Sequence, residues 1–300
     1  MDEIRAGRDA ANADLVELRL DGVSDLDMSA ALQGRRLPLI VTLCTVLVTV
    51  LAALLPFGSA YAQSGTCKSS TNGAYTVALC ITQPAAGTTL TGVTTVTATA
   101  TITGSSSGIS KLIFTLDGTY LITDYQAPYT FQLSTANYAN GTHSLAVAAT
   151  MRDGFITGAP AVTLTFSNAG APAPGPNFVP VSPAPRPAGQ SLIMAAVGDG
   201  AGGETNAGLV TQMIDGRNPD LVLYLGDVYE KGSFAEFYNW YGQSNSFYGL
   251  FRDVTNPTIG NHEYENGAAP GYFSYWYNIP NYYSYNANGW HFISLNSTSQ

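Results

Sequence analysis

Basic residues are scarce in this sequence of 300 residues, which holds 12 Lys and Arg against 21 Asp and Glu and has a formal net charge of −9. No cluster of Lys or Arg follows Arg35-Arg36, so the positive patch with which proteins bind a phosphate backbone is missing. We therefore expect no nucleic acid among the partners. If the protein handles phosphate groups, something other than basic side chains must neutralise them.

Cysteine is also rare, with three residues in the chain. Cys44 lies in a long apolar stretch, which leaves Cys67 and Cys80 for the remainder of the protein. A disulfide between these two is plausible in an exported protein, although spacing alone does not show that the two sulfurs meet.

Residues 35–62 consist of paired arginines, an apolar stretch and a small-residue end at Ala60 and Ala62, which is the layout of a secretory signal peptide. The apolar stretch, residues 37–55, is also long enough to cross a bilayer, for which about 20 residues are needed. A signal cleaved after Ala62 and an uncleaved membrane anchor therefore remain alternatives. Both predict a secreted, cell-surface or periplasmic protein, because the arginines stay inside.

Residues 1–34 form a leader of uncertain status, because export signals usually begin within a few residues of the start. The string "ADLVELRLDGVSDLDMSAALQGRRLPLIVT" resembles the opening strand, helix and second strand of type I 3-dehydroquinate dehydratase. The resemblance places that family's substrate-contacting residues at Glu17 and Arg19. No continuation of its barrel follows, so the activity is not implied. We expect a fused or misassigned leader, with the true start at Met28.

Residues 75–168 show a period of two. The run "VTATATIT" at 96–103 puts Val, Ala and Ile on one face and threonines on the other, and "AVTLTFSN" repeats the pattern at 161–168. Turn signals such as Asp117-Gly118 and Asn140-Gly141 separate such runs, which favours an all-β sandwich. The string "LDGTYLITDYQAPYTFQLSTANYANGTHSLAVAAT" resembles bacterial immunoglobulin-like domains, which serve as spacers, carbohydrate contacts or partner docks.

Residues 169–190 are dense in proline and lack an apolar period, which predicts a semi-extended linker and a domain boundary. Two further histidines carry no chemical signal in this reading. We expect His143 to be structural and His291, in "GWHFISLNS", to be a packed strand residue.

From residue 191 onward, apolar runs end in Gly-Asp or Gly-Asn. "SLIMAAVGDG" leads into Asp199, "PDLVLYLGDVYE" leads into Asp227 after a short helical pattern, and "NPTIGNHEY" leads into Asn261 and His262. These runs predict a β-α-β unit and a third strand. Residues just past the carboxyl ends of adjacent parallel strands share one crevice, so we expect the four side chains to converge there.

Two carboxylates, an amide oxygen and an imidazole form an oxygen-rich set that hard cations prefer. A central carboxylate can bridge two metals about 3.5–4 Å apart, which together clamp a phosphoryl group and generate hydroxide at neutral pH. Metal ions would also supply the positive charge that the sequence lacks.

The blocks "VGDG", "LGDVYE" and "GNHEY" resemble the calcineurin-like metallophosphoesterases, in particular their purple acid phosphatase-like branch. The resemblance implies that Asp199 binds the first metal, that Asp227 bridges, and that Asn261 binds the second metal. It also implies that His262 is catalytic and protonates the leaving alkoxide or steadies the charge of the transition state. A histidine that merely caps the turn is the alternative.

The sequence departs from the purple branch at one position. That branch has a metal-binding tyrosine three residues after the bridging aspartate, where this chain has Glu230, while Tyr229 lies one residue nearer to Asp227. We keep Tyr229 as a doubtful ligand and leave the two metal ions open among iron, zinc and manganese. Glu230 and Glu263 are expected at the rim or in solvent. The aromatic run "YFSYWYNIPNYYSY" either walls a substrate cleft or packs onto the sheet.

The family completes its site with later histidines, including a Gly-His-x-His turn, and none of these occurs here. We expect a multi-domain chain: an all-β immunoglobulin-like sandwich, then an incomplete α/β metallophosphoesterase (αββα sandwich) domain whose N-terminal part is 191–300. The predicted function is an exported metal-dependent phosphoesterase that acts on a phosphate-ester substrate, inactive as a truncated fragment. The alternative is a non-catalytic surface protein that binds through its sandwich. Substrate and oligomeric state are undetermined.

Overall fold

The computed structural model describes residues 65–170, 177–203 and 205–298, which all fall within one compact unit. The predicted leader at 1–34, the signal or anchor at 35–62 and the middle of the predicted linker lie outside these residues. Within the described ranges, no helix combines the length and the apolar character needed to cross a bilayer.

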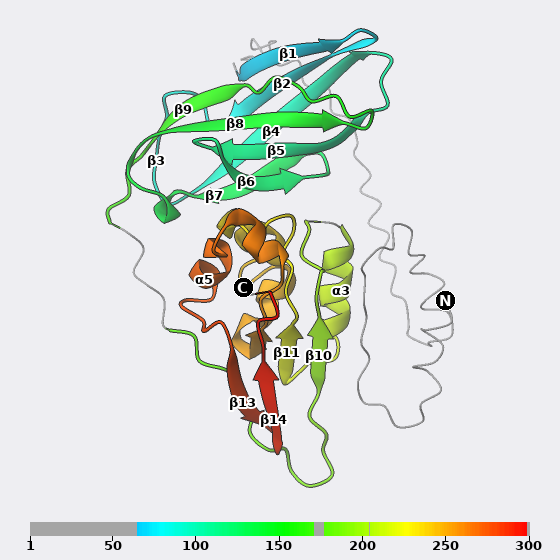
Figure 1. The fold of residues 1–300 in the computed structure, drawn as a ribbon, viewed down its shortest axis with the longest axis vertical. Coiled ribbons are helices and arrows are strands. Elements are labelled where there is room, and N and C mark those ends of the chain that lie inside the picture. Colours follow the sequence, from blue (N-terminus) through cyan, green and yellow to red (C-terminus); the bar gives the residue numbers. More distant parts are fainter. Residues whose placement is uncertain (1–64, 171–176, 204, 299–300) are drawn as a thin grey trace, which may run out of the picture. The chain divides into compact units, whose positions relative to one another are not determined.

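The first part of the described chain is a sandwich of two β-sheets (Figure 1). One sheet has the strand order β1-β2-β4-β7 and is antiparallel. The other has the order β3-β9-β8-β5-β6, with β3 and β9 parallel and the remaining neighbours antiparallel. The bounds are β1 Thr66–Asn72, β2 Tyr75–Gln83, β3 Thr89–Leu90, β4 Val93–Gly104, β5 Ile109–Leu116, β6 Thr119–Asp124, β7 Tyr129–Ser134, the 3-10 helix η1 Thr135–Asn137, β8 Gly141–Met151 and β9 Ala161–Phe166.

Alternating burial along the strands builds the core of this sandwich. Strand β2 buries every second side chain from Tyr75 to Ile81. In β4, Val96 and Ala98 are buried and Ala100 and Ile102 are partly buried against the core, while most of the threonines between them are exposed. Each fully buried aliphatic or aromatic side chain stabilises the fold by about 1.5–3 kcal/mol. The sandwich that the period of two predicts is confirmed.

His143 fastens the turn between β5 and β6. Asp117 and Gly118 adopt φ values of 53° and 78°, which a tight hairpin turn requires. The Nδ1 atom of His143 lies 2.6 Å from the Asp117 carboxylate, its Nε2 atom lies 2.8 Å from the Ala139 carbonyl oxygen, and the ring stacks on Phe166. Both ring nitrogens are therefore used within the sandwich, and the prediction of a structural histidine is confirmed.

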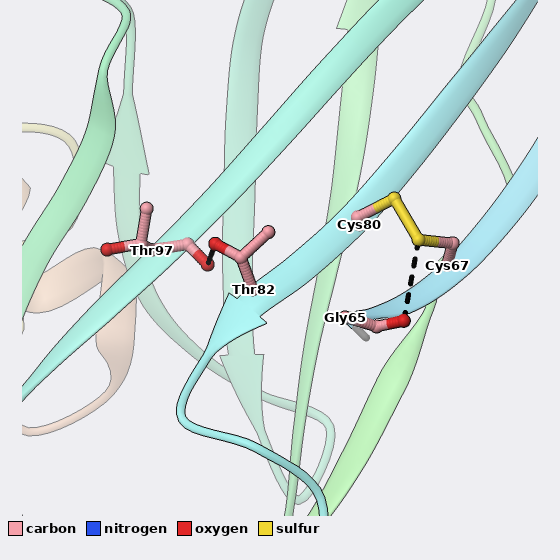
Figure 2. The surroundings of a disulfide bond; sticks show 5 residues. All are labelled: Gly65, Cys67, Cys80, Thr82 and Thr97. Carbon is pink, nitrogen blue, oxygen red and sulfur yellow. Dashed lines mark hydrogen bonds between the residues drawn. A yellow bond between two sulfur atoms is a disulfide. The ribbon is translucent and has the colours of Figure 1, made fainter. Parts of the chain in front are cut away.

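Cys67 and Cys80 lie directly opposite each other in the antiparallel pair β1–β2 and form a disulfide (Figure 2). Strand β1 is the edge strand of its sheet and is largely exposed, whereas β2 contributes alternate side chains to the core. The covalent bond therefore fastens a strand with little packing of its own to one that is well packed.

Asp124 closes the connection between β6 and β7. Its side chain is 6% exposed, and its two carboxylate oxygens accept hydrogen bonds from the backbone N–H groups of Gln126 and Thr130 at 3.0 and 3.1 Å. Burial nevertheless raises the pKa of Asp124 to about 6, because two hydrogen bonds do not fully replace the lost hydration of the charge.

The second part of the described chain is an α/β arrangement around a parallel sheet with the order β10-β11-β12. A separate antiparallel hairpin is formed by β13 and β14. The predicted β-α-β unit and third strand are therefore present. The bounds are β10 Met194–Val197, α3 Thr205–Asp215, β11 Leu221–Tyr224, α4 Phe234–Glu236, the π-helix η2 Phe237–Tyr241, the 3-10 helix η3 Phe247–Val254, β12 Thr255–Pro257, the 3-10 helix η4 His262–Asn266, α5 Pro270–Tyr275, β13 Tyr283–Ala287 and β14 Trp290–Ser294.

Aromatic side chains fill the core beside this sheet. Tyr224 of β11 meets Tyr241 and Tyr248 edge to face, with ring centroids 4.8 and 5.3 Å apart, and Tyr275 and Trp276 pack into the same cluster. Of the two interpretations of the aromatic run at 272–285, the structure supports packing for its buried members.

His291 lies in strand β14, as predicted, but its side chain is exposed and its Nδ1 atom is 2.8 Å from the side-chain oxygen of Asn286. The expectation of a packed residue is therefore wrong. In a two-stranded hairpin, alternate residues face opposite sides, and His291 is on the side without a covering layer.

The described end of the predicted linker runs along the sheet without forming a helix or strand. Val181 exchanges two backbone hydrogen bonds with the side chain of Asn256 in β12, and Arg186 forms an ion pair with Asp220. This part of the linker is thus extended, as expected, and is also bound to the α/β part.

Replacing both Cys67 and Cys80 with serine should lower the free energy of unfolding of the sandwich by about 2–3 kcal/mol, the effect typical of a closed loop of this length. Urea unfolding followed by near-ultraviolet circular dichroism measures the change. Wild-type protein treated with a reductant is the control and should match the double variant; equal midpoints for oxidised and reduced protein would contradict the prediction.

Asp124 should make the sandwich less stable as pH rises. The folded state holds the proton up to about pH 6, whereas the unfolded chain releases it near 3.8, so the stabilisation present at low pH is lost between these values. Relative to Asp124→Asn, which does not titrate, the wild type should lose up to about 3 kcal/mol between pH 4 and 7. Unfolding curves of both proteins across this range provide the test, and a constant difference would refute it.

Candidate metal centre

The three loops that carry the predicted site residues all leave the same edge of the parallel sheet. Val197 at the end of β10 is level with Tyr224 at the end of β11, which is level with Pro257 at the end of β12. Asp199 follows the first of these ends, and Asp227 follows the second. The backbone therefore delivers the predicted residues to one edge, as expected for parallel strands.

Asp199 lies close enough to Asp227 to raise the pKa of the Asp227 carboxyl. Both adopt left-handed backbone conformations, with φ values of 57° and 63°, which cost a non-glycine residue roughly 1–2 kcal/mol each. Burial raises the pKa of Asp227, and the adjacent Asp199 raises it further, while His262 opposes the shift. Two acids in contact repel each other once both are ionised, and a cation held between them would remove that repulsion.

Gly226 and Gly260 permit the loops after β11 and β12 to approach closely. A Cβ atom at Gly260 would lie 2.2 Å from an oxygen of Asp227, and one at Gly226 would lie 2.5 Å from the Gly260 nitrogen. Any side chain at either position would push the loops apart. The glycine before the acid and the glycine before Asn261 are thus steric requirements of this geometry.

Tyr229 reaches the pair of carboxylates, because its hydroxyl donates a hydrogen bond to an oxygen of Asp199. Its ring lies 4.4 Å from the imidazole of His262 in an edge-to-face contact. The phenol therefore adjoins both the candidate metal ligand and the candidate catalytic histidine, although it lies one residue earlier than the tyrosine of the purple branch.

His262 is half-buried and oriented from both ends. Its backbone N–H donates to Asp227 at 3.0 Å, and its Nδ1 atom lies 2.7 Å from the Glu230 carbonyl oxygen, so Nδ1 carries a proton and Nε2 remains for chemistry. Burial acts to lower the pKa of His262, but the hydrogen bond to Glu230 and the charges of Asp227 and Glu265 outweigh it, and the pKa is raised.

Asn261 begins the η4 turn, and its exposed side chain makes no capping hydrogen bond there. In the part of the chain that the structure describes, no group of three or more His, Cys, Asp and Glu side chains is arranged to hold a metal ion. The candidate donors that contact one another are therefore the carboxylates of Asp199 and Asp227 and the phenol of Tyr229. Their chemistry fits a hard cation between the carboxylates.

The prediction that Glu263 lies at the rim or in solvent is wrong. Its side chain is 0% exposed and accepts hydrogen bonds from the backbone N–H groups of Val228 and Gly260, both at 2.7 Å, and of Asp227 at 3.1 Å. Burial raises its pKa, and the three N–H donors oppose the shift. The one feature of the sequence that could have indicated this role is that Glu263 directly follows Asn261 and His262.

Glu230 is only partly exposed, which agrees with a position at the rim. Its side chain is half-buried, and its carboxylate accepts a hydrogen bond from the hydroxyl of Tyr125 in the sandwich. Its backbone carbonyl, rather than its acid group, is the part that faces the candidate site, through His262.

Comparison with known families matches two segments of the chain. Residues 78–147 match the family described as bacterial Ig domain. Residues 200–299 match the family described as calcineurin-like phosphoesterase. No curated protein matches the chain.

Several solved structures resemble the chain weakly. Fibronectin(III)-like modules of CbhA from Clostridium thermocellum are 24% identical over 30% of this chain and 98% of theirs, with a TM-score of 0.27. The endo-beta-1,4-mannanase of Thermotoga petrophila is 17% identical over 31% of this chain and 19% of its own, with a TM-score of 0.25. A Jonesia denitrificans lytic polysaccharide monooxygenase is 12% identical over 28% and 60%, with a TM-score of 0.22. At these TM-scores the likenesses carry no weight.

The family matches follow the order in which the two kinds of sequence pattern occur, and the second match covers the loops of Asp227, Asn261 and His262. The chain thus carries a bacterial Ig domain followed by a calcineurin-like phosphoesterase domain.

Proposed function

We propose that this protein is an exported, metal-dependent phosphoesterase of the purple acid phosphatase-like kind. The proposal rests on the placement of Asp199 and Asp227 just past the ends of adjacent parallel strands, close enough that Asp199 raises the pKa of Asp227, and on the match of residues 200–299 to a calcineurin-like phosphoesterase.

In this proposal Asp199 and Asp227 hold the metal ions, with Asn261 as a further oxygen donor and Tyr229 as a phenol beside Asp199. Bound iron, zinc or manganese would supply Lewis acidity toward the phosphoryl group and activate water. Asp227 would be the ligand shared by two ions, because it follows the central strand β11, between β10 and β12.

His262 acts as the proton donor in this proposal. Its Nδ1 proton is held by the Glu230 carbonyl, which fixes the ring and leaves Nε2 to pass a proton to the leaving oxygen. The backbone N–H of His262 also donates to the Asp227 carboxylate, so the proton donor and the candidate metal ligand keep a constant relative position.

Export is supported by the disulfide between Cys67 and Cys80, since such bonds persist in oxidising compartments. The bacterial Ig domain is likewise typical of extracellular or surface proteins. The substrate class, a phosphate monoester or diester, follows from the shared phosphoryl chemistry of the site.

In a protein that carries the complete phosphoesterase domain, Asp227→Asn should lower hydrolysis by at least about 10²-fold, because the amide preserves the shape but removes the negative charge that a cation needs. Isothermal titration with Mn²⁺ and Zn²⁺ and an assay on a panel of phosphate esters measure metal binding and turnover. Asp253→Asn, the same change at an exposed position in η3, is the matched control. Unchanged metal affinity and turnover in Asp227→Asn would refute the proposed metal site and favour a non-catalytic protein.

His262→Ala should lower kcat by about 10²-fold or more for alkyl phosphates, whose leaving group needs a proton, and far less for p-nitrophenyl phosphate, whose leaving group does not. Metal affinity should stay the same. His291→Ala, which alters an exposed histidine in β14, should leave both activities unchanged. An equal loss for both substrates would show that His262 does not act as the proton donor.

A further inference from the structure

A buried acid outside the candidate site is hydrogen-bonded to the segment that holds the imidazole of His262. Residues 229–233 follow Asp227, and we call them the Glu230 loop. The carbonyl oxygen of Glu230 accepts the hydrogen bond from Nδ1 of His262 at 2.7 Å. Any displacement of this loop therefore moves or releases the imidazole.

Glu236, in the short helix α4, holds the Glu230 loop from within. Its side chain is 0% exposed, and its carboxylate accepts hydrogen bonds from the backbone N–H groups of Glu230, Lys231 and Ser233. The Ser233 hydroxyl accepts in turn from the N–H of Glu236, which completes a capping box. The capping box needs only the bond from the Ser233 N–H. The bonds from the Glu230 and Lys231 N–H groups therefore hold the Glu230 loop.

The Ig-like sandwich supplies the partner that completes the environment of this acid. The hydroxyl of Tyr120 in β6 donates a hydrogen bond to the Glu236 carboxylate, and it lies 2.9 Å from the hydroxyl of Thr123. The hydroxyl of Ser233 donates to the carbonyl oxygen of Leu121 in the same strand. Burial raises the pKa of Tyr120, so its hydroxyl remains a proton donor across the physiological range.

A second set of contacts joins the sandwich to the segment that follows the loop. The side-chain amide of Asn239 accepts from the Gln132 N–H at 2.8 Å and donates to the Gln132 carbonyl at 3.0 Å. Gln132 lies in β7, at the edge of its sheet, so the amide takes the place of a neighbouring strand. Ala235 is 4% exposed within the core cluster of the sandwich, and Trp240 packs against that cluster.

We propose that Tyr120 and Glu236 are positioning residues for the candidate active site, through which the Ig-like sandwich fixes the Glu230 loop and thereby His262. The sandwich is then a structural part of the phosphoesterase site and not a spacer. The role in hydrolysis rests on the proposed function, whereas the positioning of the loop and the imidazole does not.

The test compares Tyr120→Phe, which removes one hydroxyl, with Tyr138→Phe, which removes a hydroxyl from another part of the sandwich. The full chain is used in both cases. Backbone amide exchange at Glu230, Lys231 and Ser233 should accelerate about tenfold in Tyr120→Phe, as expected when a buried hydrogen bond to the acid that holds these amides is lost. The ¹⁵N resonance of the His262 Nδ1 atom should shift toward that of a free imidazole. Tyr138→Phe should change neither.

Hydrolysis of phosphate esters is the third quantity to be measured, after amide exchange and the His262 resonance. In Tyr120→Phe, kcat should fall about tenfold while KM and Mn²⁺ affinity stay unchanged, because the imidazole and not the metal site is displaced. Glu236→Gln should show the same pattern more strongly, and thermal unfolding checks that each variant is folded. Unchanged amide exchange and an unchanged His262 resonance in Tyr120→Phe would overturn the proposal. A protein with the complete phosphoesterase domain that hydrolyses no ester while both spectroscopic changes appear would refute the proposed function and support the positioning.

Discussion

The buried carboxylate of Glu263 is the interaction on which the candidate site depends. It binds the backbone N–H groups of Asp227 and Val228 after β11 and of Gly260 after β12, so one side chain sets the distance between two loops. A carboxylate without solvent exposure requires such donors, because an uncompensated buried charge costs several kcal/mol. The bonds between the Asp227 carboxylate and the His262 N–H, and between His262 Nδ1 and the Glu230 carbonyl, join the same two loops.

In the part of the chain that the structure describes, backbone N–H groups compensate the buried acids Asp124, Glu236 and Glu263. Glu263 and Glu236 each accept three of them, and Asp124 accepts two. In a chain with few Lys and Arg, carboxylates thus shape the loops through backbone donors. The carboxylates of Asp199 and Asp227 differ from these three, because each has another acid close by and Asp199 raises the pKa of Asp227. That excess of negative charge is the electrostatic reason for expecting a cation at this edge of the sheet.

The sequence predicted those features that depend on neighbours along the chain. The alternation at 96–103 and 161–166 predicted sandwich strands because the two faces of a strand repeat every second residue. The apolar runs before Asp199 and Asp227 predicted parallel strands whose ends bring the two acids to one edge. Cys67 and Cys80 were candidates by elimination, and the register of β1 against β2 brought them together.

Only the tertiary structure decided which polar groups are buried. Glu263 and Val228 are 35 residues apart in the chain, and Tyr120 and Glu236 are 116 apart, so no local pattern relates them. The exposure of His291 depended in the same way on whether another layer covers β14. The sequence by itself determined the elements and the chemical types at their ends, because both are local. Burial, and with it the task of each acid, depended on packing between distant segments.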